Sequence, residues 1–288
     1  MTLLAPELDQ SHHTPPWRAH LIVEAPRRGR LTFWLTASGA IWYDEHMTPI
    51  EHTVQAIQQG TSECLQTAGT QTMNFYDSSI ALDDVLANVP VYVNDAGEKI
   101  GTSTGHFAAY MVSLGFSVVT YVFDTEFFDR SWQGFAAQQV VANLEERQPH
   151  IPANSWLTGN SEILIDGWRR YAEAGGQFAF DNVSVKLLRD LLDDGPYMVI
   201  VNSNYLNGSA KWQYDKTTDT FVASATAGRS LTHAMTCAGY KNGQFLIVDP
   251  DPPRGVDHHR WIAQDHLIAS IMSAQTESDN MVIVGRKG

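Results

Sequence analysis

The spacing of hydrophobic and polar positions changes along the chain. Up to about residue 194, apolar residues recur mostly at helical spacing, and residues typical of helix caps flank these segments. From residue 197 onward, short runs rich in Val, Ile and Phe indicate the strands of one sheet. Helices that precede strands, instead of alternating with them, predict the α+β class.

The expected elements follow from this pattern. We predict helices at residues 63–76, 79–87, 104–114, 131–147, 161–174 and 184–194. A further helix is predicted to begin at the capping box Thr48-Pro49-Ile50-Glu51. Strands are predicted at 116–123, 197–203, 232–240, 244–249 and 281–284, and an antiparallel ribbon at 18–24, 30–36 and 40–44. We therefore expect an N-terminal extension with a short β-ribbon (residues 1–49) and one domain (residues 50–288).

The composition of the chain argues against several classes of function. The chain has 288 residues, of which 43% are hydrophobic and 18% charged, as expected for a folded protein with a proper core. Its 19 Lys and Arg against 32 Asp and Glu give a net charge of −13, which repels phosphate backbones and argues against general nucleic-acid binding. No run of about 18 apolar residues predicts a membrane span, and no signal peptide is evident. We expect a cytoplasmic protein.

The two cysteines have different surroundings. Two thiols cannot form a disulfide framework or a four-cysteine zinc site, although they could bridge each other. Because no export signal is evident, we expect a reducing compartment in which both thiols are free. Cys64 lies in the first turn of a predicted helix, where unpaired N–H groups and the helix dipole favour a thiolate. Cys237 lies within a predicted strand and is interpreted as a small core residue.

The position of Asp249 relative to His233 depends on the turn between two strands. A two-residue Asn-Gly turn would pair Lys241 with Gln244 and place Asp249 on the face opposite His233. A three-residue loop would instead pair Tyr240 with Gln244, so that Asp249 lies across from Met235 and diagonal to His233. Our hypothesis is the three-residue loop. A Lys241–Gln244 pair would count against a His–Asp couple.

A thiolate, an imidazole and an orienting carboxylate form a nucleophilic triad. Such chemistry also needs donors for the developing oxyanion. Gln58 and Gln59 precede Cys64 by six and five residues, so that either amide could reach back over the thiol, and the backbone N–H of Cys64 could be the second donor.

Four segments in order resemble one family. Residues 58–76 look like the nucleophile helix of papain-like cysteine peptidases, in the branch similar to bacteriocin-leader-processing (double-glycine) peptidases. Segments similar to the same branch follow at 82–86 with 105–115, at 188–192 with 195–201, and at 233–239 with 245–250. The resemblance covers about residues 50–285, and the first 50 residues have no counterpart in it.

The resemblance implies a papain-like two-lobed fold, with a helical lobe carrying Cys64 and an antiparallel β-sheet lobe carrying His233 and Asp249. It implies Cys64 as nucleophile, His233 as general base and acid, Asp249 as its orienter, and Gln58 as oxyanion donor, with no cofactor. One departure is that the family usually has Gly-Pro after its cysteine, whereas this chain has Leu65-Gln66.

The reaction is left open within this class. Water as acceptor gives a peptidase or amidase, and an amine gives an acyltransferase or peptide ligase through the same acyl-enzyme. A non-catalytic binding protein on the same fold is a further alternative. The expected partner is a peptide or a small amide or acyl substrate, and the acidity of the chain hints at a basic one.

The remaining candidate residues are possible metal ligands and further histidines. A metal site could draw on Asp249, Asp251, Asp257, His258 and His259, but this segment also reads as a solvated, proline-broken loop, and no metal is expected. His12-His13 is interpreted as a polar tail, and His106 as a packed or capping residue.

Overall fold

The computed structural model describes residues 19–23, 31–36, 39–42, 48–93, 99–151, 156–215, 217–218, 220–274 and 281–287. Its α-helices are α1 (Cys64–Asn74), α2 (Leu82–Asn88), α3 (Thr104–Ser113), α4 (Ala137–Arg147), α5 (Trp156–Glu173), α6 (Val185–Leu191), α7 (Ser203–Asn207) and α8 (Gln264–Met272). In the described part of the chain, no helix is both long and apolar enough to cross a membrane.

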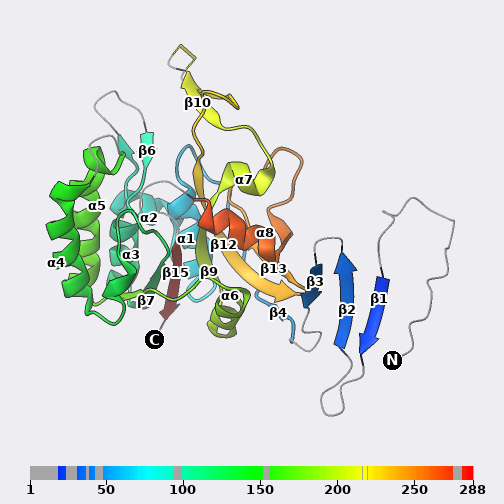
Figure 1. Cartoon of the computed structure of the whole chain (residues 1–288). Coiled ribbons are helices and arrows are strands. Elements are labelled where there is room, and N and C mark those ends of the chain that lie inside the picture. Colours follow the sequence, from blue (N-terminus) through cyan, green and yellow to red (C-terminus); the bar gives the residue numbers. More distant parts are fainter. Residues whose placement is uncertain are drawn as a thin grey trace.

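One sheet organises the described residues 48–287. Its strands run in the order β14 (His259–Ala263), β13 (Gln244–Val248), β12 (Thr232–Lys241), β9 (Tyr197–Asn202), β15 (Met281–Lys287), β7 (Phe116–Val122) and β8 (Gln177–Ala179), and β4 (Ile50–Glu51) pairs with β12. All neighbours are antiparallel except β7 and β8, which are parallel. Helices and a mostly antiparallel sheet confirm the α+β class (Figure 1).

The segregation of helices and strands is less complete than predicted. β7 and β8 come from the helix-rich part of the chain and extend the sheet, while α7 and α8 lie in its strand-rich last third. Figure 1 shows α3, α4 and α5 together on one side of the molecule, and α8 on the part of the sheet formed by β9 and β13. Both halves of the chain therefore share a single sheet.

The two faces of the sheet carry separate hydrophobic clusters, because neighbouring residues of a strand point to opposite faces. On one face, α1, α3, α4 and α5 pack against residues that include Met198, Ile200 and Ala234. On the other face, α6 and α8 pack against residues that include Val199 and Met235. Strands buried on both faces explain why their sequences are continuously apolar.

The predicted helix at the Thr48 capping box is wrong. Ile50 and Glu51 instead form strand β4, in which Ile50 pairs with Tyr240. Ile50 packs on the second cluster, and Val54 is buried against residues of β12 and β13. Most helix stability in proteins comes from packing an apolar face, and a capping signal alone contributes little. Ile50 and Val54 pack on the sheet instead, so the chain forms a strand here.

The N-terminal residues form a sheet of their own. β1 (Ala19–Val23), β2 (Leu31–Thr36) and β3 (Gly39–Trp42) pair antiparallel in that order. The division of the chain at residue 49 stays a prediction, and His12-His13 lies outside the described residues.

Several short elements had no recognised sequence signal. These are β5 (Tyr92–Val93), β6 (Lys99–Gly101), β8, the hairpin β10 (Trp212–Asp215) with β11 (Thr220–Ala223), α7, β14 and α8. The hairpin projects away from the sheet (Figure 1). Most of these elements have five residues or fewer, too short for a periodic pattern to distinguish them.

Candidate active site

Helix α1 places Cys64 as its first residue and is embedded in the protein. All residues from Leu65 to Met73 are buried. The hydroxyl of Thr236 on β12 lies 3.0 Å from the carbonyl oxygen of Ala68, 3.1 Å from Gln71 Oε1 and 3.2 Å from Thr72 Oγ1. These buried contacts join α1 to the strand that carries His233, so that the helix start and the histidine are held in a fixed relation.

The residues that begin α1 are constrained. Ser62 has a φ of 64°, a left-handed conformation that non-glycine residues adopt infrequently and that clusters at functional sites. The Glu63 carboxylate accepts a hydrogen bond from the Gly60 N–H at 2.9 Å. Gln66, which stands where the resembled family has proline, is buried and donates to the Val89 carbonyl oxygen at 2.8 Å and to Thr102 Oγ1 at 2.6 Å. At this departure from the family pattern, the Gln66 side chain therefore anchors the start of α1.

The turn between β12 and β13 differs from our hypothesis. Lys241 pairs with Gln244, and Asn242 and Gly243 have φ values of 52° and 73°, so the connection is a two-residue Asn-Gly turn of type I′. A β-bulge between Cys237 and Gly239 then shifts the register by one residue, and Thr236 pairs with Val248. Asp249, the next residue, thus falls beside Met235, which is the position that the three-residue loop would have given it.

The bulge brings His233 and Asp249 together. His233 Nε2 lies 2.7 Å from Asp249 Oδ1, and the Asp249 side chain has no exposed surface. Asp249 Oδ1 also accepts the Asp251 N–H at 2.9 Å, while Asp249 Oδ2 accepts from Arg260 Nη2 at 2.7 Å. The carboxylate is therefore held by three donors, two of them able to carry positive charge.

The surroundings of Cys64 and His233 favour charge separation between the two side chains. Burial acts to raise the pKa of Cys64, but hydrogen bonding to His233, its positive charge, and the N–H groups of Ala234 and Leu65 together bring that pKa below 9.0. Burial acts to lower the pKa of His233, but the hydrogen bonds to Asp249 and Cys64 raise it. Since Nε2 faces Asp249, Nδ1 is the ring nitrogen left for the thiol. The lowered pKa of Cys64 and the raised pKa of His233 both favour a thiolate beside an imidazolium.

The two candidate oxyanion donors are placed differently. Gln58 is exposed, and its Nε2 donates to Asp251 Oδ1 at 3.1 Å. Gln59 is less exposed, its N–H donates to the Pro250 carbonyl oxygen at 3.0 Å, and its Oε1 is buried without a partner among the described residues. Both glutamines therefore contact the segment that follows Asp249.

Cys237 is a core residue, as the sequence indicated. It is fully buried in the second cluster, and burial raises the pKa of its thiol to about 12. A thiol in this environment is inert at neutral pH.

The residues considered as metal ligands are used for other contacts. His258 Nδ1 lies 2.6 Å from the Asp249 carbonyl oxygen, and His259 Nε2 lies 2.9 Å from that of Val54. Among the residues that the structure describes, no group of three or more His, Cys, Asp or Glu side chains is arranged to hold a metal ion.

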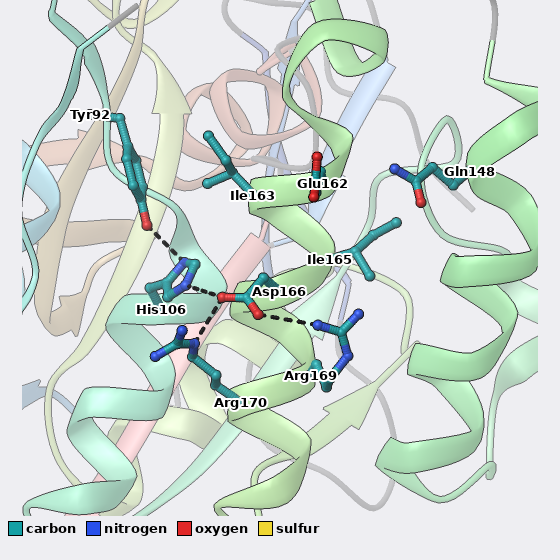
Figure 2. Close-up of a pocket in the computed structure, with 9 residues that line it drawn as sticks. All are labelled: Tyr92, His106, Gln148, Glu162, Ile163, Ile165, Asp166, Arg169 and Arg170. Carbon is teal, nitrogen blue, oxygen red and sulfur yellow. Dashed lines mark hydrogen bonds and ion pairs between the residues drawn. The ribbon is translucent and has the colours of Figure 1, made fainter.

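A second histidine–aspartate pair lines a cavity of about 460 Å³ beside α5 (Figure 2). Cys64, His233 and Asp249 do not line this cavity. His106 Nδ1 lies 3.0 Å from the Tyr92 hydroxyl, and His106 Nε2 lies 3.0 Å from Asp166 Oδ2. Arg169 and Arg170 donate to the same carboxylate at 3.1 and 2.8 Å. Because its charges largely neutralise each other, we interpret this network as a tie between α3 and α5.

The packing of the same two helices supports that interpretation. A Cβ atom added at Gly105 would lie 2.6 Å from backbone atoms of Gly167 and Trp168, so the helices cross in direct backbone contact. The His106 N–H donates to Ser103 Oγ at 3.4 Å, so the residue that caps α3 is Ser103 and His106 is a packed residue of its first turn.

Sequence reasoning missed Arg260, which completes the surroundings of Asp249. It lies on β14, a strand that was not predicted, and its Nη1 donates to Asn207 Oδ1 on α7 at 2.8 Å. The sequence around Arg260 has no periodic pattern or motif that would predict its contact with Asp249.

Comparison with known proteins finds a similar solved structure. No family model matches the sequence, and no curated protein matches it. The fold is similar to that of the crystal structure of a "putative C39-like peptidase" from Bacillus anthracis, with 10% sequence identity and a TM-score of 0.44 over 84% of this chain and 99% of that one. A likeness of this size leaves the chemistry to be judged from the residues of this chain.

Proposed function

We propose that this protein carries out cysteine-dependent acyl chemistry on a peptide or amide, as a papain-like peptidase or amidase. The observation that carries the proposal is the chain of contacts from the partly exposed Cys64 through His233 to the buried Asp249. A reactive cysteine needs a lowered pKa and access to substrate, and Cys64 combines the two whereas Cys237 has neither.

The reaction would proceed in two stages. The Cys64 thiolate attacks the carbonyl carbon, a C–S bond forms, and the carbonyl oxygen becomes an oxyanion. The C–N bond then breaks, and His233 gives its proton to the leaving amine. In the second stage His233 takes a proton from water, the hydroxide attacks the thioester, and the thiolate leaves. Asp249 holds the imidazole in the orientation that both transfers require.

The experiment that tests this function is intact-mass spectrometry of the protein with a set of short peptide amides of basic, neutral and acidic sequence. We expect an acyl adduct on Cys64 and release of the free acid, with a preference for the basic peptides that follows from the net charge of −13. Added glycinamide separates the two reactions, because an acyltransferase would yield the amide product instead of the acid.

The matched controls use the two cysteines. Cys237→Ala should retain the adduct and Cys64→Ala should lose it. If no acyl-enzyme forms with any peptide, and Cys64 is no more reactive than an ordinary thiol, the non-catalytic alternative is correct.

We further propose that Gln58 donates to the oxyanion. Its Nε2 donates to Asp251 in the segment that follows Asp249, and it would have to exchange that contact for the substrate. Gln58→Ala is expected to lower kcat by about 10²-fold, the effect of removing one oxyanion donor, with little change in KM. The measurement is steady-state hydrolysis of the preferred peptide amide.

Gln59→Ala is the matched comparison, because the neighbouring residue has the same side chain and also contacts the segment after Asp249. It is expected to retain most of kcat. A larger loss in Gln59→Ala than in Gln58→Ala would transfer the role to Gln59.

A further inference from the structure

Arg260 is a largely buried cation whose contacts converge on the triad. Its side chain is 15% exposed, and Nη2 donates to Asp249 Oδ2 at 2.7 Å on the side of the carboxylate that His233 does not use. Nη2 also lies 4.0 Å from Met235 Sδ. The guanidinium thus binds Asp249 Oδ2, the carboxylate oxygen that His233 does not contact.

Asn207 holds the other side of the guanidinium, since its Oδ1 accepts from Arg260 Nη1 at 2.8 Å. The helix that carries Asn207 is itself fixed, because His266 Nε2 on α8 lies 2.9 Å from the Leu206 carbonyl oxygen. Arg260 Nε is buried without a partner among the described residues. A buried N–H left unpaired is unfavourable, so the arginine is kept in place by its other contacts.

Positive and negative charges alternate along the row of side chains Arg260, Asp249, His233 and Cys64. Arg260 and protonated His233 flank the Asp249 carboxylate, and the Cys64 thiolate follows His233. Two positive and two negative groups make the buried cluster neutral. Without Arg260 the same groups would carry a net negative charge in a site with little access to water, where charge is costly.

We propose that Arg260, oriented by Asn207, is a positioning residue that fixes the Asp249 carboxylate and balances the charge of the Cys64–His233–Asp249 triad. This inference rests on the proposed function and deepens it. Arg260 acts through Asp249 and touches neither the thiol nor the scissile bond.

The proposal predicts a change in pH dependence with a definite sign. Loss of a positive charge disfavours the Cys64 thiolate and favours protonated His233, so both pKa values rise. Loss of packing alone would slow the reaction without moving its pH profile. Among the described residues, Asp251 and His258 from the β13–β14 loop are further titratable groups that contact Asp249, and Glu63 is next to Cys64 in the sequence. None of the three is altered.

The experiment measures the rate of Cys64 alkylation by iodoacetamide against pH, with the site identified by peptide mass spectrometry. In Arg260→Gln we expect the midpoint of the alkylation profile to rise by about one pH unit, the low end of the shift caused by a neighbouring charge. Arg260→Lys, which keeps the charge, is expected to restore most of the shift. Arg254→Gln removes an exposed arginine from the same loop and is expected to leave the profile unchanged.

Asn207→Ala provides a second variant if Arg260→Gln does not fold, because it keeps the charge but releases the guanidinium. We expect a smaller upward shift, in the same direction. Midpoints that coincide with the wild-type value in every folded variant would overturn the proposal. Failure of the proposed function is distinguishable, since in that case wild-type Cys64 itself would titrate as an ordinary thiol.

Discussion

His233→Ala is expected to reduce turnover of a peptide amide by about 10⁵-fold or more, since removal of the histidine from a nucleophilic triad costs about 10⁶-fold in a well-studied hydrolase. The variant removes the hydrogen bond and the positive charge that lower the pKa of Cys64, while burial of the thiol continues to raise it. It also removes the proton donor for the leaving amine. Turnover of the preferred peptide amide by wild type and variant is the measurement.

A substrate-free form of this prediction uses iodoacetamide at about pH 6.5, where a thiol of pKa 9.0 is about 0.3% thiolate. An ion-paired Cys64 gains up to about 300-fold in thiolate, of which part is lost because a thiolate of low pKa is a weaker nucleophile. We therefore expect His233→Ala to slow Cys64 alkylation by about 30-fold. Equal labelling of Cys64 and Cys237, unaffected by the substitution, would exclude the triad.

The pH profile of wild-type turnover should follow from the titration of Cys64 and His233. Activity is expected to rise as pH increases through the lowered pKa of Cys64, because the thiolate forms. It is expected to fall again as pH passes about 10, the raised pKa of His233, because the imidazole then has no proton for the leaving amine. A rising limb near 9.0, the ordinary thiol value, would contradict the ion pair.

The sequence predicted the helix that begins at Cys64 and the strand of His233 because both have strong local signals. The helix follows Gly60 and Ser62, and the strand is a long and largely apolar run. The juxtaposition of Asp249 with His233 was predicted through the wrong turn. The Asn-Gly pair forms the two-residue turn that its sequence favours, and the extra residue of the bulge restores the register.

A bulge of this kind is set by tertiary contacts. A Cβ atom on Gly239 would lie 2.6 Å from the Ile50 carbonyl oxygen, so the bulged strand has room for β4 only because residue 239 is glycine. The sequence shows the glycine but not the strand that approaches it, since residues 48–51 favoured a helix locally. Arg260 was missed for a related reason, because its role depends on the neighbours that the sheet brings to it.

Asp249→Asn should be among the most damaging substitutions of this chain, although it preserves the shape of the side chain. Asp249 receives three donors, from His233, Asp251 and Arg260, and an amide has only one oxygen to offer them. If that oxygen faces His233, the amide NH₂ meets the guanidinium. If it faces Arg260, the NH₂ meets His233 Nε2 and favours the wrong tautomer. We expect turnover to fall by about 10⁴-fold, as in triads whose aspartate becomes asparagine.

The same substitution leaves Arg260 as a buried charge without its counter-ion. We expect Asp249→Asn to lower the free energy of unfolding by about 3–5 kcal/mol, measured by urea denaturation. Asp251→Asn is the matched control, because its carboxylate is exposed and its contact with Asp249 comes from the backbone, and it should stay within about 0.5 kcal/mol of wild type.

The double variant Asp249→Asn/Arg260→Gln separates the two roles of the carboxylate. Because it removes the unpaired charge as well, most of the lost stability should return, as when both members of a buried ion pair are replaced together. Turnover should stay low, since the imidazole still lacks an anionic partner. A double variant no more stable than Asp249→Asn would show that the guanidinium does not need the carboxylate. Recovery of turnover together with stability would instead assign Asp249 to the fold and remove it from the chemistry.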